Sequence, residues 1–184
     1  MASLYVIRHG KTDWNEIKRI QGSTDTSLND EGIGMARKAH DEYEGVRFDI
    51  CFCSPLKRAR QTAELLLEGR DIPIEYDDRL RELSFGEFEG VEYPLLPEDH
   101  PLRKAFRDPV NYTPPGGAES LPHLLERTGQ FLEEKVYPLI DQGKDVLIVG
   151  HGAMNCSLIL NAKKLPLDKF WEEGIENCVL KRLL

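Results

Sequence analysis

"LYVIRHGKTDWN" is the sequence of residues 4–15, and it contains the feature from which a fold can be predicted. Residues 4–7 are apolar and include a valine and an isoleucine, which is typical of a strand buried on both faces of a sheet. Arg8 and His9 follow this run directly, and Gly10 comes next. A cation and an imidazole at the end of a buried strand are unusual for a purely structural edge. We therefore expect Arg8 and His9 to have a function.

Strand-like and helix-like segments alternate along the rest of the chain. Further strands are predicted at residues 48–53 and 146–149, with weaker ones at 74–76 and 178–183. Helices are predicted from Asn29 or Asp30 to 43, from Pro55 to 67 with Ser54 as the cap, from Glu119 or Ser120 to about 137, and after Gly152. Such alternation indicates parallel β-α-β units with right-handed crossovers. The expected fold is α/β, a three-layer αβα sandwich around a mostly parallel central sheet.

Residues 84–117 interrupt the alternation and contain six of the eleven prolines. Long irregular segments on a rigid scaffold are often binding loops or lids. We expect a cap-like insertion here, with one short helix around residues 102–107, lying over one end of the sheet. A chain of 184 residues suits one globular domain, so residues 1–184 are expected to form a single domain that carries this insertion.

Composition excludes several classes of partner. The formal net charge is −8, so a nucleic-acid backbone would be repelled, although a few clustered cations would still bind a small phosphorylated ligand. The N-terminal residues lack the basic stretch and long apolar run of a signal peptide, and no apolar run is long enough to span a bilayer. We expect a cytoplasmic protein with no nucleic-acid or membrane partner. The oligomeric state is left open.

Cations and histidines recur where predicted strands give way to helices. Arg8 and His9 stand at the first such junction, Arg58 stands shortly after the second strand, and His151 follows the strand at 146–149. In a parallel sheet all carboxyl ends lie on one edge, where open α/β folds place their ligands, so these side chains should converge. Guanidinium groups and helix N-termini both favour phosphate oxygens. The sequence therefore predicts a site for a phosphate dianion.

Several known kinds of phosphate chemistry do not fit the sequence. Neither Cys51 nor Cys53 has the downstream arginine that a Cys-x5-Arg motif requires, because Lys57 and Ala59 occupy those positions. No GxxxxGK[ST] loop and no cluster of Asp and His at metal-ligand spacing is present. The four cysteines contain no CxxC pair, which excludes the usual zinc motifs. Neither a metal nor a cofactor is expected.

The segment "RHGKTDWN" resembles the RHG motif of the histidine phosphatase superfamily, which includes the cofactor-dependent phosphoglycerate mutases. The resemblance continues in family order through "RIQGSTDTSLNDEG", "SPLKRARQTA", "LRELSFGEFEG", "PPGGAES" and "VGHGAMN". It covers almost the whole chain. A lone RHG tripeptide would be weak evidence, whereas several ordered segments are specific.

The resemblance implies a role for each residue of the predicted site. His9 is the nucleophile that accepts the phosphoryl group, which requires a neutral imidazole whose second nitrogen donates to an acceptor such as a backbone carbonyl. Arg8, Arg58 and His151 hold the phosphoryl oxygens. Glu82 matches the family's acid, and Glu87 and Glu89 remain structural alternatives to it.

Four further positions rank second. Asn15, Gln21 and Gly22 match the family's loop after the nucleophile, where the two amides could donate hydrogen bonds to the phosphate. Gly152 follows His151 and belongs to the expected substrate-binding set. For Asn15 and Gln21, an interpretation as ordinary polar loop residues is nearly as good.

The function expected from the residues and the resemblance is hydrolysis of small organic phosphate monoesters, with a phosphorylated metabolite as partner and inorganic phosphate as product. A mutase is the first alternative, and Arg103, Lys104 and Arg107 are the cations available for its second phosphate. A module that binds a phospho-ligand or a protein without catalysis is the second alternative. An apolar pocket wall is predicted from the aromatic residues Phe85, Phe88, Tyr93 and Tyr112.

Overall fold

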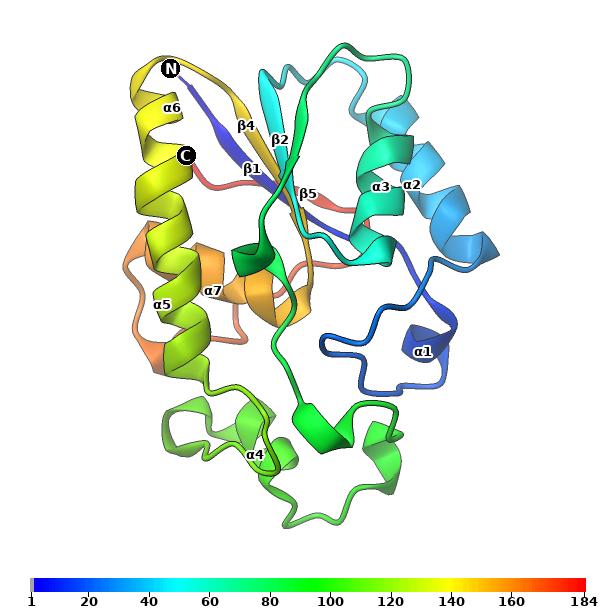
Figure 1. Ribbon diagram of the computed structural model, residues 1–184, viewed down its shortest axis with the longest axis vertical. Coiled ribbons are helices and arrows are strands. Elements are labelled where there is room, and N and C mark those ends of the chain that lie inside the picture. The colour runs from blue at the N-terminus through cyan, green and yellow to red at the C-terminus, as the bar shows by residue number, and fades with distance from the viewer. Residues whose placement is uncertain (1) are drawn as a thin grey trace.

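The computed structural model describes residues 2–184 and contains one five-stranded sheet in the order β3-β2-β4-β1-β5 (Figure 1). The strands are β1 (Leu4–Arg8), β2 (Ile50–Cys53), β3 (Ile74–Tyr76), β4 (Val146–Gly150) and β5 (Leu180–Arg182). Strands β1 to β4 run parallel to their neighbours, whereas β5 pairs antiparallel with β1 at one edge. The prediction of a mostly parallel sheet is confirmed.

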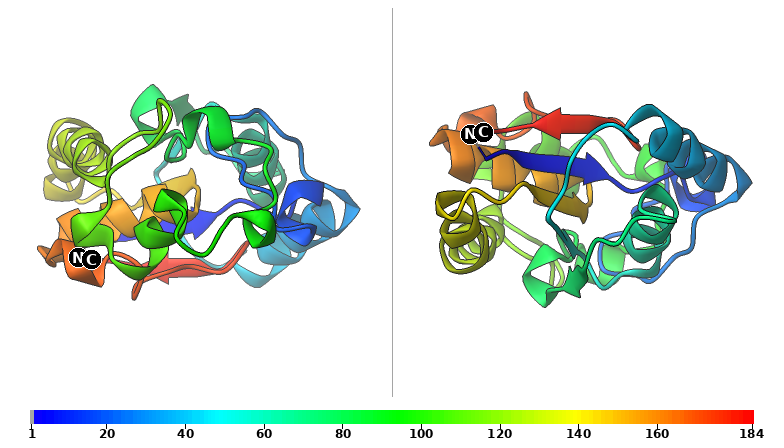
Figure 2. Two further views of the ribbon diagram at one scale, coloured as in Figure 1. Left: turned by 90° about the horizontal axis from the view of Figure 1, so that it is seen from below. Right: turned by 90° about the horizontal axis from the view of Figure 1, so that it is seen from above.

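Helices cover both faces of the sheet, as Figures 1 and 2 show. On one side lie α2 (Asp30–Glu42) and α3 (Lys57–Leu66), and on the other lie α5 (Leu121–Phe131), α6 (Tyr137–Asp141) and α7 (Gly152–Lys163). Two short helices, α1 (Asp13–Glu16) and α4 (Pro101–Arg107), lie beyond the carboxyl end of the sheet. The three-layer αβα sandwich is therefore confirmed. Within residues 2–184, every helix is too short or too polar to cross a bilayer.

Alternation along the strands produces two separate cores. Neighbouring residues on a strand point to opposite faces of the sheet. Val6 accordingly packs in the core beneath α5 and α7, together with Phe131, while Ile7 packs in the core beneath α2 and α3, together with Ala63. All five residues of β4 are buried, as expected for a central strand covered on both faces.

The starts of α2 and α3 illustrate one confirmed and one wrong cap. Asn29 caps α2, because its Oδ1 accepts a hydrogen bond from the Gly32 amide at 2.8 Å. The prediction that Ser54 caps a helix beginning near Pro55 is wrong. Helix α3 begins at Lys57, whose amide donates to Asp25 Oδ1 at 2.6 Å.

The helix predicted between Glu119 or Ser120 and about 137 begins as expected, with Ser120 as the cap of α5. It continues past the predicted end through a wider turn, Leu132–Val136, into α6. Pro138 lies at the start of α6 and has no amide hydrogen, so it cannot close an ordinary helical turn onto the preceding residues. The wide turn directly before Pro138 accommodates the absence of this hydrogen bond.

The insertion at residues 84–117 lies beyond the carboxyl ends of the strands, at the bottom of Figure 1 and towards the viewer in the left view of Figure 2. It contains α4 near the predicted position and the short turns Gly86–Phe88, Tyr93–Leu95 and Pro109–Asn111. Arg103 holds its fold together, since its guanidinium donates to the carbonyls of Pro94, Leu96 and Pro97. The insertion is thus placed to cover a site at this edge.

Two glycines allow α2 to approach the loop that carries His9. A side chain at Gly32 would collide with the carbonyl oxygen of Lys11, and a Cβ at Gly10 would lie 2.5 Å from the carbonyl oxygen of Gly32. Real Cβ atoms do not come so close to backbone atoms. Backbone therefore rests on backbone here, and only glycine fits at either position.

Gly32→Ala is expected to destabilise the protein by about 2 kcal/mol, because backbone must shift to admit the methyl group. Gly34 provides the matched control in the same helix, since a Cβ there meets open space. Gly34→Ala should leave stability unchanged or raise it by up to about 1 kcal/mol through helix propensity. Urea denaturation of the two variants measures the difference. Equal stabilities would contradict the close approach.

Candidate active site

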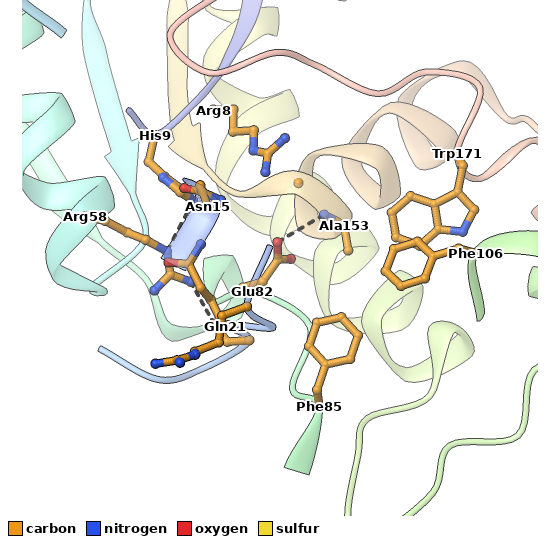
Figure 3. Close-up of a pocket in the computed structure, with 13 residues that line it drawn as sticks. Arg8, His9, Asn15, Gln21, Arg58, Glu82, Phe85, Phe106, Ala153 and Trp171 are labelled. Carbon is orange, nitrogen blue, oxygen red and sulfur yellow. Dashed lines mark hydrogen bonds between the residues drawn. The ribbon is translucent and has the colours of Figure 1, made fainter. Parts of the chain in front are cut away.

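A pocket of about 250 Å³ opens at the carboxyl edge of the sheet (Figure 3). Its lining combines polar groups with three aromatic rings: Arg8, His9, Asn15, Arg19, Gln21, Gly22, Arg58, Glu82, Phe85, Phe106, Gly152, Ala153 and Trp171. Every residue of the predicted site except His151 belongs to this lining. The convergence predicted from the parallel sheet therefore holds, and His151 lies directly behind it.

His9 is buried and held in one tautomer. Its Nδ1 lies 2.6 Å from the carbonyl oxygen of Gly10, an acceptor, so the ring proton is on Nδ1. Its Nε2 therefore carries a lone pair, which accepts a hydrogen bond from Arg58 Nε at 3.2 Å. The Asn177 amide donates to the His9 carbonyl at 2.6 Å and fixes the backbone. The ring is therefore a neutral imidazole with an unprotonated Nε2, the form that a nucleophile requires.

The electrostatic surroundings keep His9 neutral. Burial is the largest cause that lowers its pKa well below the usual value, and the nearby guanidinium groups of Arg58 and Arg8 lower it further. The hydrogen bond to Gly10 acts in the opposite direction but is a smaller effect. His9 therefore remains unprotonated on the acid side of neutrality.

Arg58 is a buried cation with fixed partners. Its side chain comes from the first turn of α3 and is 1% exposed. Nη1 donates to the Thr24 carbonyl at 2.8 Å and Nη2 donates to the Gly22 carbonyl at 2.7 Å, while Nε reaches His9. Burial lowers its pKa to about 10, so it is still charged at neutral pH. Nη1 also lies 3.4 Å from Thr26 Oγ1, so of the five guanidinium hydrogens the second one on Nη2 remains available to an anion.

His151 stacks edge-on against His9, with ring centroids 5.2 Å apart. Its Nε2 lies 2.7 Å from Ser54 Oγ, which also accepts from the Leu56 amide at 3.3 Å. The Ser54 hydroxyl hydrogen can then go to Nε2, which leaves a hydrogen on Nδ1. That Nδ1 is buried and has no partner among residues 2–184, so it can donate to a ligand. Burial first, then Arg58 and His9, lower the pKa of His151, and the ring is neutral.

Arg8 ends β1 and meets the N-terminus of α7. Its Nε is buried without a partner in the described chain, and its Nη1 is 3.5 Å from the Ile175 carbonyl. Gly152 leaves space beside it, since a Cβ there would lie 3.6 Å from Arg8 Cζ and 3.5 Å from Glu82 Oε2. The first residue of α7 therefore lies between a cation and a carboxylate.

Glu82 places its carboxylate on the first turn of α7, as Figure 3 shows. Oε2 accepts from the Ala153 amide at 3.2 Å, and Oε1 accepts from the Met154 amide at 2.9 Å. The alternatives Glu87 and Glu89 do not line the pocket of residues 2–184. Glu89 instead accepts hydrogen bonds from the amides of Ser23 and Phe85, a structural role.

A partly buried ion pair fixes the segment that carries Glu82. Arg127 on α5 donates to the carbonyls of Arg79 and Glu82, at 2.5 and 3.2 Å. It also binds Glu119 through Nε and Nη2, at 2.7 and 3.0 Å. The Glu119 amide in turn donates to the Ser84 carbonyl at 2.8 Å. Glu82 is therefore held from both sides along the backbone.

Asn15 and Gln21 are oriented by Thr12. The Thr12 amide donates to Asn15 Oδ1 at 3.1 Å, and its hydroxyl donates to Gln21 Oε1 at 2.9 Å. Thr26 Oγ1 donates to the same Gln21 oxygen at 2.7 Å. Because both amide oxygens are engaged, the NH2 groups are the available donors of these two pocket-lining side chains. The neighbouring Gly22, with φ +54°, turns its carbonyl to Arg58.

Four lining residues were missed by sequence reasoning, and one of them, Ala153, directly follows the predicted Gly152. Arg19 is the first residue of "RIQG" and lies between the predicted residues Asn15 and Gln21 in the sequence. This nearness was the available signal. Phe106 comes from α4, and Trp171 joins it with a centroid separation of 4.7 Å. Trp171 lies far along the chain, and no motif indicated its place.

The predicted aromatic wall is correct only in part. Phe85 lines the pocket and Tyr93 lines a smaller pocket beside it. Phe88 packs against His100 at a centroid separation of 4.7 Å, and Tyr112 is buried in the core. Neither of these two belongs to the pocket found in residues 2–184. Both side chains are aromatic and were therefore predicted to line the pocket, but Phe88 instead packs against His100 and Tyr112 packs in the core.

The cysteines and metal-binding residue types form no competing site. Burial raises the thiol pKa of Cys51 and Cys53, and it raises that of Cys156 and Cys178 to about 12. Such thiols remain protonated and are poor nucleophiles. Across residues 2–184, no group of three or more His, Cys, Asp or Glu is placed to hold a metal ion.

The two buried neutral histidines predict a loss of stability in mild acid. The unfolded chain takes up protons below about pH 6.5, whereas His9 and His151 in the folded protein do not until a much lower pH. Each should reduce the unfolding free energy by about 1.4 kcal/mol per pH unit below 6.5. Urea denaturation between pH 7.5 and 5 measures the slope. In His151→Asn the slope should fall by about half, and an unchanged slope would contradict the assignment.

Comparison with known proteins places the chain in a family. Residues 4–184 match the histidine phosphatase superfamily (branch 1). A 2,3-bisphosphoglycerate-dependent phosphoglycerate mutase of Gloeobacter violaceus is 32% identical, with 97% of this chain and 84% of that protein covered. An uncharacterized phosphatase, PhoE, of Bacillus subtilis is 37% identical, with 83% and 73% covered.

A solved structure agrees. The mycobacterial glucosyl-3-phosphoglycerate phosphatase in complex with VO3 superposes with a TM-score of 0.88 at 29% identity, covering 99% of this chain and 92% of that one. The match of residues 4–184, the fold and the ordered motifs agree with one another: the chain belongs to the histidine phosphatase superfamily.

Proposed function

We propose that this protein is a phosphatase that hydrolyses small organic phosphate monoesters through a phosphohistidine formed at His9 Nε2. One observation carries the proposal. The His9 imidazole has its proton fixed on Nδ1 by Gly10, so that Nε2 presents a lone pair to a pocket lined by Arg8 and Arg58. Family membership supports the same chemistry.

In the first step, His9 Nε2 attacks the phosphorus atom and the bond from phosphorus to the ester oxygen breaks. Glu82 gives its proton to the leaving oxygen, which departs as an alcohol. Arg8, Arg58 and His151 Nδ1 donate to the equatorial oxygens and stabilise the charge as the phosphoryl group moves. The amides of Asn15 and Gln21 supply further donors.

In the second step, water attacks the phosphohistidine. The Glu82 carboxylate takes a proton from that water, the bond from nitrogen to phosphorus breaks, and inorganic phosphate leaves. His9 returns to its neutral form and Glu82 is protonated again. The cycle uses groups of this chain and water alone.

Hydrolysis is favoured over mutase chemistry by the outer half of the pocket. A mutase must retain a second phosphate, yet Arg103, Lys104 and Arg107 do not line the pocket within residues 2–184. Arg103 is committed to backbone carbonyls, and Arg107 pairs with Glu98 at 2.8 Å. Beyond Arg8 and Arg58 the lining contains the rings of Phe85, Phe106 and Trp171 and a single further cation, Arg19, which is paired with Glu92. The mutase remains the second candidate because relatives of both kinds resemble the chain.

Phosphate release from a panel of metabolite monoesters, with chelator present, tests the proposal. The wild type should release phosphate, and His9→Ala should lose at least about a thousandfold in kcat because the nucleophile is gone. A labelled substrate should leave an acid-labile, base-stable label on the wild type alone. Activity abolished by chelator would contradict a metal-free mechanism.

The same panel separates the alternatives. Transfer of phosphate between positions of 3-phosphoglycerate faster than its release would indicate a mutase. Binding of phosphate esters without turnover, retained in His9→Ala, would indicate a binding module.

Glu82→Gln should lower kcat for alkyl phosphates by about a hundredfold or more, because the leaving alkoxide loses its proton donor. With p-nitrophenyl phosphate the leaving group needs no proton, so the first step should survive and phosphoenzyme should accumulate as a burst of nitrophenolate. Glu87→Gln, which changes a carboxylate outside the pocket lining, is the matched control and should behave as the wild type. Equal losses in both variants, or no burst, would assign the acid elsewhere.

A further inference from the structure

Arg19 lies where two cavities meet. It lines the catalytic pocket and also a smaller pocket of about 190 Å³ that lies beside it. The two share Asn15, Arg19, Phe85 and Phe106, so they lie next to each other. The smaller pocket adds a second cation, Lys18. A substrate whose phosphate lies at His9 would extend past these residues.

The guanidinium of Arg19 is positioned but not saturated. It lies over the Trp14 ring, 5.4 Å from the centroid, and its Nη2 donates to Glu92 Oε1 at 3.2 Å. Its Nε is buried and has no partner among residues 2–184. One engaged hydrogen out of five leaves donor capacity for a ligand. The ring and the carboxylate together limit the rotamers of a long side chain.

The other cations nearby already have roles or partners. Of the three arginines in the pocket lining, Arg8 and Arg58 surround the phosphoryl site. Arg103 and Arg107 are taken up within the insertion, as described above. Arg19 is the remaining arginine of the lining, and the proposed hydrolysis of the phosphate does not use it.

We infer that Arg19 binds a carboxylate of the substrate, so that the preferred substrates are phosphate monoesters whose leaving group carries a carboxylate. Glu92 already offsets part of the Arg19 charge, which suits a singly charged carboxylate better than a second phosphate dianion. The rings of Phe85 and Phe106 line the space between and would contact a short carbon chain. The inference rests on the proposed phosphatase activity and narrows its substrate class.

A pair of substrates that differ at one position tests the inference. 3-Phosphoglycerate and glycerol 3-phosphate differ in a carboxylate against a hydroxymethyl group. The wild type should release phosphate from 3-phosphoglycerate with a kcat/KM roughly tenfold or more above that for glycerol 3-phosphate, the size of one charged hydrogen bond. Arg19→Leu should lose this preference while its kcat/KM for glycerol 3-phosphate stays near the wild-type value. Arg19→Lys should retain part of it.

Two matched variants act as controls. Arg107→Leu removes a cation of the insertion that is paired with Glu98 and should leave the preference unchanged. Glu92→Gln removes the carboxylate that competes for Arg19 and should maintain or raise the preference. Inhibition by inorganic phosphate should be the same in Arg19→Leu and the wild type, which shows that the phosphoryl site is intact.

The outcomes separate the two proposals. Wild-type protein that hydrolyses both substrates with equal kcat/KM would overturn the carboxylate subsite and leave the phosphatase standing. Protein that hydrolyses no monoester of the panel would overturn the phosphatase first. An equal loss of preference in Arg107→Leu and Arg19→Leu would indicate a general field effect and would also overturn the inference, as would a reduced preference in Glu92→Gln.

Discussion

The hydrogen bond from His9 Nδ1 to the carbonyl of Gly10 is the constraint on which the rest of the site depends. It fixes the tautomer, and with it the lone pair that Arg58 and the pocket surround. Burial and two guanidinium groups make the protonated ring unfavourable, so the His9 imidazole stays neutral. The cations that would attract a phosphate group therefore also keep His9 neutral, which is the form able to accept the phosphoryl group.

The parallel sheet supplies the geometry that local sequence alone does not. Arg8, Arg58 and His151 leave three different strand ends, and the sheet order places those strands side by side. Glu82 comes from outside the sheet and is brought in by the ion pair of Arg127 and Glu119, which grips the backbone on both sides of it. The proposed nucleophile is therefore placed by the sheet, and the proposed acid is held against the N-terminus of α7 by these polar contacts.

Sequence reasoning succeeded where a pattern has one physical solution. Buried strands followed by capped helices left few choices of fold, and the shared edge of a parallel sheet predicted the convergence of cations. It failed where a side chain had two possible partners. Ser54 could cap a helix or bind His151, and only the packed structure shows the latter. Trp171 reaches the pocket through its bond to the Ala105 carbonyl, a contact across the chain that no local pattern encodes.

The contact of Gly10 with Gly32 constrains one side of the site more tightly than the other. On that flank the loop that follows His9 packs backbone to backbone against the start of α2, and there is no room for a side chain between them. Another part of the pocket wall consists of Phe106 and Trp171, side chains that belong to no strand. Different leaving groups would therefore be accommodated at this aromatic wall, while the packing of Gly10 on Gly32 fixes the loop that carries the reacting nitrogen.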